Sequence, residues 1–225
     1  GLDISSHYGM TTDSFNRYLI FTNRMSSSDY TIWVPITISG APDFSARFGV
    51  MPPSNNQFGA LADTVRGRIY HCEYSNGYLI GQDLPAALTG LSQGNYANVS
   101  GNTLFTLPSQ NAPNLSFPGT APSDGGYHDG WNDIYYFVGR NDSNLHSYNP
   151  NTSSWTNHGS GSGWNTFYGI CKDPSSNYFI YSNRNVGWDM FQGYTGANIS
   201  TYTSGFTSFP SNSEDSIIAW NGDIY

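Results

Sequence analysis

Charge is the scarcest property of this 225-residue chain, at 11% of its residues against roughly 25% in a typical soluble domain. One lysine and two glutamates are present, although these residue types commonly cover the outer faces of helices. The shortage argues against a coiled coil or a helix bundle. Disorder is excluded as well, because aromatic residues make up 16% of the chain and supply apolar surface for a core.

The chain also lacks basic runs and long apolar runs. Its net charge is −8 and its seven arginines are scattered, whereas a nucleic-acid-binding protein needs clustered cations to release counterions from phosphates. The same deficit disfavours an anionic membrane surface. The longest mostly apolar stretch, Tyr30–Ile38, is interrupted by Pro35 and is less than half a membrane span. We therefore expect no nucleic-acid partner and no membrane insertion.

Cysteines and histidines are too few and too widely spaced to predict a disulfide framework or a metal centre. Cys72 and Cys171 are the only cysteines, and isolated cysteines are commonly buried thiols. The five histidines form no HxH or HExxH spacing, and none lies near a serine in a nucleophile-elbow sequence. The sequence thus predicts no cofactor, no metal site and no catalytic residue within the chain.

An internal repeat is the strongest positive feature of the sequence. His7–Arg24 aligns without gaps with Phe167–Arg184, and seven of the eighteen positions are identical. Weaker copies begin near residues 58 and 125, and another copy restarts near residue 213. The repeat predicts blade-like units at 7–57, 58–124, 125–166 and 167–212, followed by a truncated unit at 213–225.

Each unit is predicted to form four short strands separated by Gly, Ser, Asn, Asp and Pro. No window has a helical period over ten or more residues. Four-stranded repeats of about 40 to 50 residues are typical of a β-propeller. The predicted fold class is therefore all-β, a β-propeller of four-stranded blades with about four and a half blades visible in a larger propeller. In the first unit the predicted strands cover about 7–12, 17–23, 31–39 and 46–51.

The third unit carries a family resemblance. The pair Gly125–Gly126 precedes an aromatic strand, and Tyr148 and Trp155 follow in a strand–turn–strand segment. This pattern resembles a kelch blade and is closest over residues 125–158. The resemblance implies a propeller built from kelch-like repeats.

An aspartate recurs just before the turn between the first and second strands of four units. An Asp side chain in this place accepts hydrogen bonds from the backbone amides of its own turn. A residue repeated in every blade is typical of a folding requirement, so we interpret these residues as turn caps, with a catalytic or calcium role as the alternative. They are Asp13, Asp63, Asp129 and Asp173.

The second unit is longer than the others because it holds an insertion over about 91–122, rich in Asn, Ser, Gly and Pro. Insertions in repeat proteins tend to lie on the functional face. The alternative interpretation is a surface loop without a direct role.

Arginine, asparagine and tyrosine recur near the ends of the strands that face one mouth of a propeller. Planar amide and guanidinium donors beside aromatic rings suit sugar recognition. The alternative is that each arginine pairs with a carboxylate or carbonyl of a neighbouring blade. The candidate ligand-binding residues are Tyr8, Asn23, Arg24, Arg140, Asn141, Tyr168, Asn183 and Arg184.

These features predict a non-catalytic binding module, extracellular or on a virion surface, that recognises a glycan or a protein surface through one propeller face. A surface rich in Ser, Asn, Gly and Tyr resembles the composition of antibody paratopes. One alternative is a structural component of a viral tail or fibre, or of a cell-surface assembly with other chains. Another is the propeller part of a secreted enzyme with catalytic residues elsewhere. Because the chain opens with Gly1 and stops at Tyr225 within a repeat, we expect a segment of something longer.

Overall fold

The structure is a computed structural model, and it describes part of the chain. The described residues are 7–23, 30–51, 57–73, 77–91, 95–97, 99, 101–107, 112–119, 121–139, 144–160, 167–172, 179–183, 187–191, 201–203, 219–220 and 223–224. For 7–9, 23, 57–58, 73, 123–124, 160, 167–169, 171–172 and everything from 179 onward, the description covers the backbone alone.

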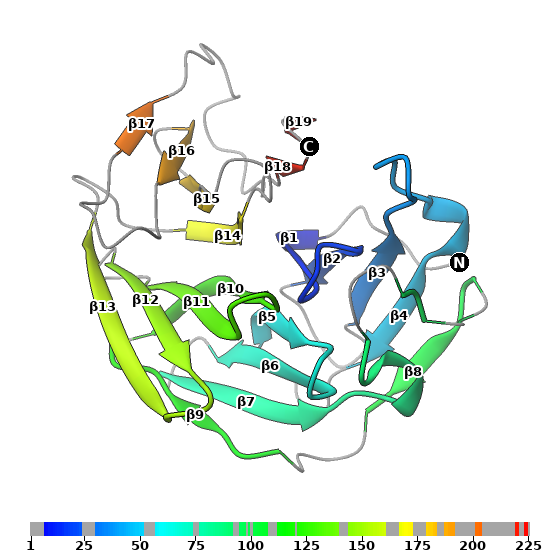
Figure 1. Cartoon of the computed structure of the whole chain (residues 1–225), viewed down its shortest axis with the longest axis horizontal. Coiled ribbons are helices and arrows are strands. Elements are labelled where there is room, and N and C mark those ends of the chain that lie inside the picture. The colour runs from blue at the N-terminus through cyan, green and yellow to red at the C-terminus, as the bar shows by residue number, and fades with distance from the viewer. Residues whose placement is uncertain are drawn as a thin grey trace.

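The described chain consists of strands, with two short 3₁₀ helices at Phe44–Ala46 and Ala86–Leu88 (Figure 1). Four groups of four strands follow one another, and we number them blades 1 to 4. Blade 1 contains β1 (His7–Thr12), β2 (Tyr18–Asn23), β3 (Thr31–Pro35) and β4 (Phe48–Met51). Blade 2 contains β5 (Gln57–Asp63), β6 (Arg68–Glu73), β7 (Tyr78–Asp83) and β9 (Leu115–Ser116).

The last two blades and a hairpin complete the described elements. Blade 3 contains β10 (Pro122–Asp129), β11 (Ile134–Gly139), β12 (Asn144–Asn149) and β13 (Ser154–Ser160). Blade 4 contains β14 (Phe167–Lys172), β15 (Phe179–Asn183), β16 (Gly187–Phe191) and β17 (Thr201–Thr203). The hairpin pairs β18 (Ala219–Trp220) with β19 (Asp223–Ile224).

Sequential strands pair antiparallel within each blade, as expected when short turns join them. In blade 1 the observed strands agree with the predicted ones to within a few residues, except that β3 ends at Pro35 rather than near residue 39. Residues 36–43 instead fold back, with the amide of Asp43 donating to the carbonyl of Pro35 at 2.8 Å. Proline lacks the N–H that a continuing strand would use.

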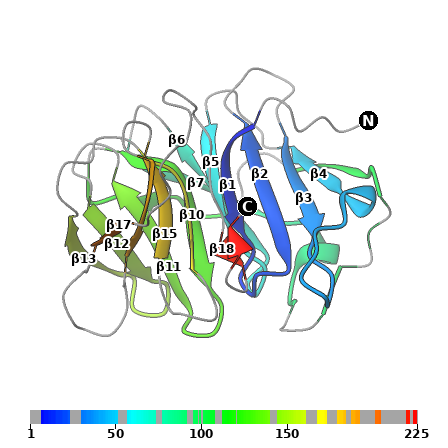
Figure 2. The ribbon, with the colours of Figure 1, turned by 90° about the horizontal axis from the view of Figure 1, so that it is seen from above.

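The first strands of the four blades, β1, β5, β10 and β14, lie beside one another around a common centre (Figure 1). The Thr11 hydroxyl of β1 lies 2.7 Å from the Gly126 carbonyl of β10 and 3.2 Å from the Ile170 carbonyl of β14. Strands β1 and β14 pair in parallel through Met10 and Gly169, which joins blades 1 and 4 into one sheet. In the view of Figure 2, the strands of neighbouring blades lie along roughly the same axis. This arrangement is an all-β propeller.

Aromatic side chains fill the spaces between blades. Between blades 1 and 2, Trp33 and Phe48 stack with ring centroids 5.8 Å apart and share a buried cluster with Ala60 and Ala62. Large rings on one blade thus lie against small side chains on the next. Strand β11 is buried on both faces along most of its length, which explains its nearly continuous apolar sequence.

Between blades 2 and 3, the second cluster is mostly aromatic. Tyr70 and Tyr135 lie 5.5 Å apart, and Phe117 contacts Phe137 with a centroid distance of 6.2 Å. Cys72 is a buried thiol in the same cluster. The side chain of Cys171 lies outside the described residues.

The insertion of the second unit is more than a surface loop. Its strand β8 (Leu104–Thr106) pairs in parallel with β4 and so adds a fifth strand to blade 1. Leu107 is buried in the core cluster between blades 1 and 2, and Phe105 packs against that cluster. The insertion therefore stabilises the packing of blade 2 against blade 1.

Candidate functional site

Three turns, each joining the first and second strands of a blade, meet near the centre of the propeller. The amide of Gly130 in blade 3 donates to the carbonyl of Ser14 in blade 1 at 2.8 Å. A Cβ at Gly130 would lie 2.6 Å from that carbonyl, so a larger residue would separate the turns. We define the turn junction as the side chains of Asp13, Ser14, Arg17, Asp63, Thr64, Arg66, His128, Asp129 and Asp133.

The recurring aspartates cap these turns, as the sequence predicts. Asp13 accepts from the amides of Arg17 at 2.5 Å and Tyr18 at 3.0 Å. Asp63 accepts from the amide of Arg66 at 2.9 Å. Asp129 accepts from the amides of Trp131 and Asn132 at 3.1 and 3.3 Å. The prediction is confirmed in blades 1 to 3, and Asp173 lies outside the described residues.

The buried pair Asp13–Arg17 also links the blades. Arg17 donates through Nε and Nη2 to one carboxylate oxygen of Asp13, at 3.1 and 2.5 Å. The Thr64 hydroxyl of blade 2 donates to the same oxygen at 3.3 Å. Arg17 further donates to the carbonyl of Asn95 in the insertion. A guanidinium that donates twice to one carboxylate oxygen and has further partners offsets part of the cost of burying two charges.

A serine, a histidine and two aspartates come together from three blades. Ser14 Oγ lies 2.7 Å from His128 Nδ1, and Asp63 Oδ1 lies 3.3 Å from the same nitrogen. On the other side of the ring, Asp133 Oδ1 lies 3.2 Å from His128 Nε2. These are the side-chain types of a nucleophilic triad. Because Ser14, His128 and Asp63 are each 0% exposed, the Ser14 hydroxyl faces protein groups, and the arrangement holds the three turns together.

Arg66 and Asp133 form the outer part of the turn junction. Arg66 makes a bidentate contact with Asp133 and also donates to Asp63 Oδ2 at 3.0 Å. Asn151 donates to Asp133 at 2.7 Å. Hydrogen bonds from Arg66, and then from His128, hold the pKa of Asp133 well below its usual range. Hydrogen bonding to Asp133 in turn raises the pKa of Arg66. Asp133 has a positive φ of 56°, a conformation that Asp adopts more easily than most residues.

Tyr135 donates to Asp63 Oδ2 at 2.5 Å from the neighbouring blade. Burial, and then the charge of Asp63, raise the pKa of this phenol. The phenol therefore keeps its proton and serves Asp63 as a donor. Asp63 thus accepts hydrogen bonds from its own turn and from blade 3.

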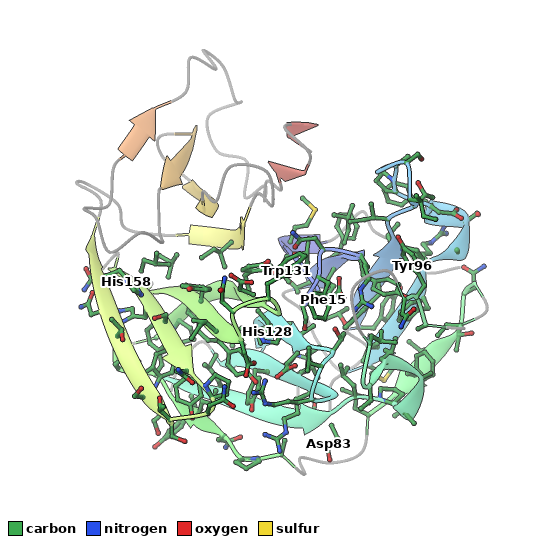
Figure 3. The ribbon with its side chains drawn as sticks, viewed as in Figure 1. Phe15, Asp83, Tyr96, His128, Trp131 and His158 are labelled. Carbon is green, nitrogen blue, oxygen red and sulfur yellow. The ribbon has the colours of Figure 1, made fainter. Side chains whose placement is uncertain are left out.

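Three aromatic side chains lie near the turn junction, with Trp131 and Phe15 close together and Tyr96 apart from them (Figure 3). The rings of Trp131 and Phe15 meet edge to face, with centroids 5.3 Å apart and planes at 89°. The Arg17 guanidinium lies 5.3 Å from the Phe15 ring centroid and contacts Asn95, the neighbour of Tyr96. Trp131 is 44% exposed and Tyr96 is 39% exposed. We refer to Trp131, Phe15 and Tyr96 as the aromatic row.

The sequence-predicted mouth lies at the opposite strand ends from the turn junction. Asn23 ends β2 and pairs with His7, while Asn183 ends β15 and pairs with Phe167, so the two asparagines occupy equivalent places in blades 1 and 4. Tyr8 and Tyr168 likewise occupy equivalent places in β1 and β14. The side chains of these four residues lie outside the described part, as do Arg24, Arg140, Asn141 and Arg184 entirely.

The sequence does not predict the aromatic row or the partners of His128. Trp131 carries a weak signal, because a tryptophan in a polar turn is unusual among solvent-facing residues. His128 and Ser14 carry none, since they are 114 positions apart and belong to no shared motif.

The described residues show neither a metal cluster nor a helix suited to a membrane. There, no three His, Cys, Asp or Glu side chains are arranged to hold a metal ion. No helix in the described segments combines the length and the apolar character needed to cross a membrane.

Comparison with known proteins supports the architecture. No protein-family model matches the chain, and no curated protein sequence matches it. A chain in the crystal structure of a nidogen/laminin complex, a known β-propeller structure, is similar with a TM-score of 0.50 and 10% identity. The match covers 82% of this chain and 60% of that one. This chain is a β-propeller.

A second solved structure, the hydrazine synthase of Kuenenia stuttgartiensis, matches with a TM-score of 0.45 and 8% identity, over 84% of this chain and 46% of that one. This chain therefore spans 60% or less of the length of both solved structures. At such low identity the nidogen/laminin likeness concerns the fold alone.

Proposed function

We propose that this chain is a non-catalytic binding module that recognises a glycan or a protein surface through one face of the propeller. One contrast carries the proposal. The described groups best suited to nucleophilic or acid–base chemistry, Ser14, His128 and Asp63, are buried and bonded to one another. Beside them, exposed side chains such as Trp131 and Asn132 are aromatic or uncharged. Rings and amides of this kind suit recognition.

Kelch-like repeats are the form of propeller that we propose. The support is physical and comes from the third unit. A Cβ at Gly126 would lie 2.3 Å from a ring carbon of Phe137, so the inner strand requires glycine where it approaches an aromatic strand. Tyr148 and Trp155 then pack together with ring centroids 5.0 Å apart, which accounts for the two aromatic positions of the pattern.

An extracellular or virion-surface location belongs to the same proposal. It is supported by the lysine-poor composition, with Ser, Asn, Gly and Tyr in place of charge. The eight mouth residues predicted from the sequence stay candidates for ligand contact, and possible partners are a glycan, a protein surface or neighbouring chains of an assembly.

The test is a binding screen of the full chain against immobilised glycans and cell-surface protein fractions, with turnover of each bound glycan followed in parallel. We expect saturable binding without bond cleavage. For the predicted mouth, Arg24→Ala and Arg184→Ala are compared with Arg47→Ala, because Arg47 lies on a loop at the other strand ends, where it donates to the Phe44 carbonyl. Hydrolysis of a bound glycan, or no saturable ligand at all, would contradict the proposal.

A further inference from the structure

We infer that the aromatic row binds an uncharged oligosaccharide, on the face opposite the mouth that the sequence predicts. The inference rests on the proposed function, since it names a ligand class and a second surface for the same binding module.

Trp131 is exposed although its backbone is held by hydrogen bonds. The amide of Trp131 donates to Asp129 at 3.1 Å, and the preceding Gly130 donates to Ser14 at 2.8 Å. The edge of one ring against the other at 5.3 Å orients the indole on Phe15. An aromatic side chain held in this way loses little conformational freedom when a ligand stacks on it.

The aromatic row is built from three segments of the chain, and Tyr96 is linked to the Trp131–Phe15 pair through Arg17 and Asn95. Trp131 contacts Phe15, the Arg17 guanidinium lies over Phe15, and Arg17 donates to the residue preceding Tyr96. Tyr96 is itself fixed, because its hydroxyl donates to the Ile36 carbonyl and its ring lies 5.9 Å from Tyr18. Several rings in sequence suit the apolar faces of successive pyranose units, whereas one ring would suit a single sugar.

The charge around the aromatic row favours a neutral ligand. The two arginines beside the row are already paired, Arg17 with Asp13 and Arg66 with Asp63 and Asp133. Within the turn junction four aspartates accompany these two arginines and His128. A sialylated or sulfated sugar would meet net negative charge here, whereas the exposed amides of Asn132 and Asn151 can bond to neutral hydroxyls.

The experiment is a titration of the ¹⁵N-labelled chain with neutral β- and α-linked oligosaccharides and with their sialylated or sulfated counterparts. The indole N–H signal of Trp131 is assigned by its loss in Trp131→Phe. We expect this signal to shift with neutral sugars, and affinity to fall about tenfold in Trp131→Ala. Trp131→Phe keeps a stacking ring and should stay within about threefold of the original affinity. Tyr78→Ala is the control, because Tyr78 is 46% exposed and lies at the start of β7.

The outcomes separate this inference from the proposed function. Binding of a neutral glycan that leaves the Trp131 signal unmoved, and that Arg24→Ala or Arg184→Ala abolishes, overturns the inference and keeps the binding module. Loss in Tyr78→Ala equal to that in Trp131→Ala also overturns it. A protein ligand that is lost on Trp131→Ala, with no glycan bound, overturns the sugar assignment. A preference for the acidic sugars would do the same.

Discussion

Two buried residues of this propeller have properties that their positions in the strands alone do not predict. They are His71 on β6 and Gly126 on β10. The first is an ionisable ring that is 1% exposed, and the second is a glycine whose missing side chain leaves room for a neighbouring ring. Each leads to a measurable prediction.

Burial lowers the pKa of His71 to about 3 from its ordinary value of 6.5. The folded chain therefore holds the neutral ring, and proton uptake by the unfolded chain weakens folding below that ordinary value. The contribution of neutral His71 to the free energy of unfolding is fully present above pH 6.5 and declines as the pH falls toward 3. We expect His71 to contribute a loss of about 2 kcal/mol between about pH 7 and pH 5. Urea unfolding at both pH values should show a smaller loss in His71→Gln. An equal loss in both proteins would contradict this.

Gly126→Ala should destabilise the fold, while Gly125→Ala should have little effect. The nearest atom to a Cβ at Gly126 is a Phe137 ring carbon at 2.3 Å, whereas at Gly125 it is the Ala60 carbonyl at 3.7 Å. Phe137 is buried and cannot move aside freely, so we expect a cost of about 1–3 kcal/mol. Thermal unfolding of the two variants measures the difference. Similar midpoints would show that the inner strand tolerates a side chain at both positions.

At the scale of elements, β8 is the least expected strand. It belongs to the insertion of one unit but pairs with the edge of another, through Gly49 with Leu104 and Val50 with Phe105. The same segment buries Leu107. An element that would ordinarily be a loop thus closes the outer edge of blade 1, which an unpaired strand would leave open to other chains.

Leu107→Ala should therefore cost about 2–5 kcal/mol in the free energy of unfolding, because Leu107 is 4% exposed. Leu104→Ala, in the same segment, should change it by less than about 0.5 kcal/mol, because Leu104 is 44% exposed. Denaturant unfolding compares them directly. Equal small effects would mean that the insertion packs too loosely to support blade 1.

At the scale of the whole molecule, the turn junction makes three blades depend on one another. Asp63 of blade 2 contacts Arg66 of its own turn and both His128 and Tyr135 of blade 3. Ser14 of blade 1 joins the same network through His128. Polar groups buried in such a network become costly when one partner is removed.

Asp63→Ala should destabilise the propeller by about 3–5 kcal/mol and should speed amide hydrogen exchange in β2 and β11 as well as in β6. Asp83→Ala is the matched control, since Asp83 is exposed and lies at the outer part of blade 2 (Figure 3). That control should cost less than about 1 kcal/mol. Faster exchange confined to β6 would show that the blades open independently.

Much of the fold follows from local patterns in the sequence. Alternating apolar residues and turn residues predict the strands of blade 1, and Asp13, Asp63 and Asp129 are recognisable as turn caps because each bonds to amides within five positions of itself. The nearly continuous apolar sequence of β11 likewise predicts burial on both faces of the strand. These features depend on residues that are close along the chain, so the sequence alone is enough to predict them.

The candidate surfaces depend instead on contacts between distant segments. Ser14 and His128 are 114 positions apart, and Arg17 reaches Asn95 across 78 positions. Neither pair leaves a periodic or spacing signal, because the propeller brings them together only when its blades close around the centre. The sequence by itself determined the repeats, the strands and their turn caps. The tertiary structure alone decided which turns meet, where β8 pairs and which rings form the aromatic row.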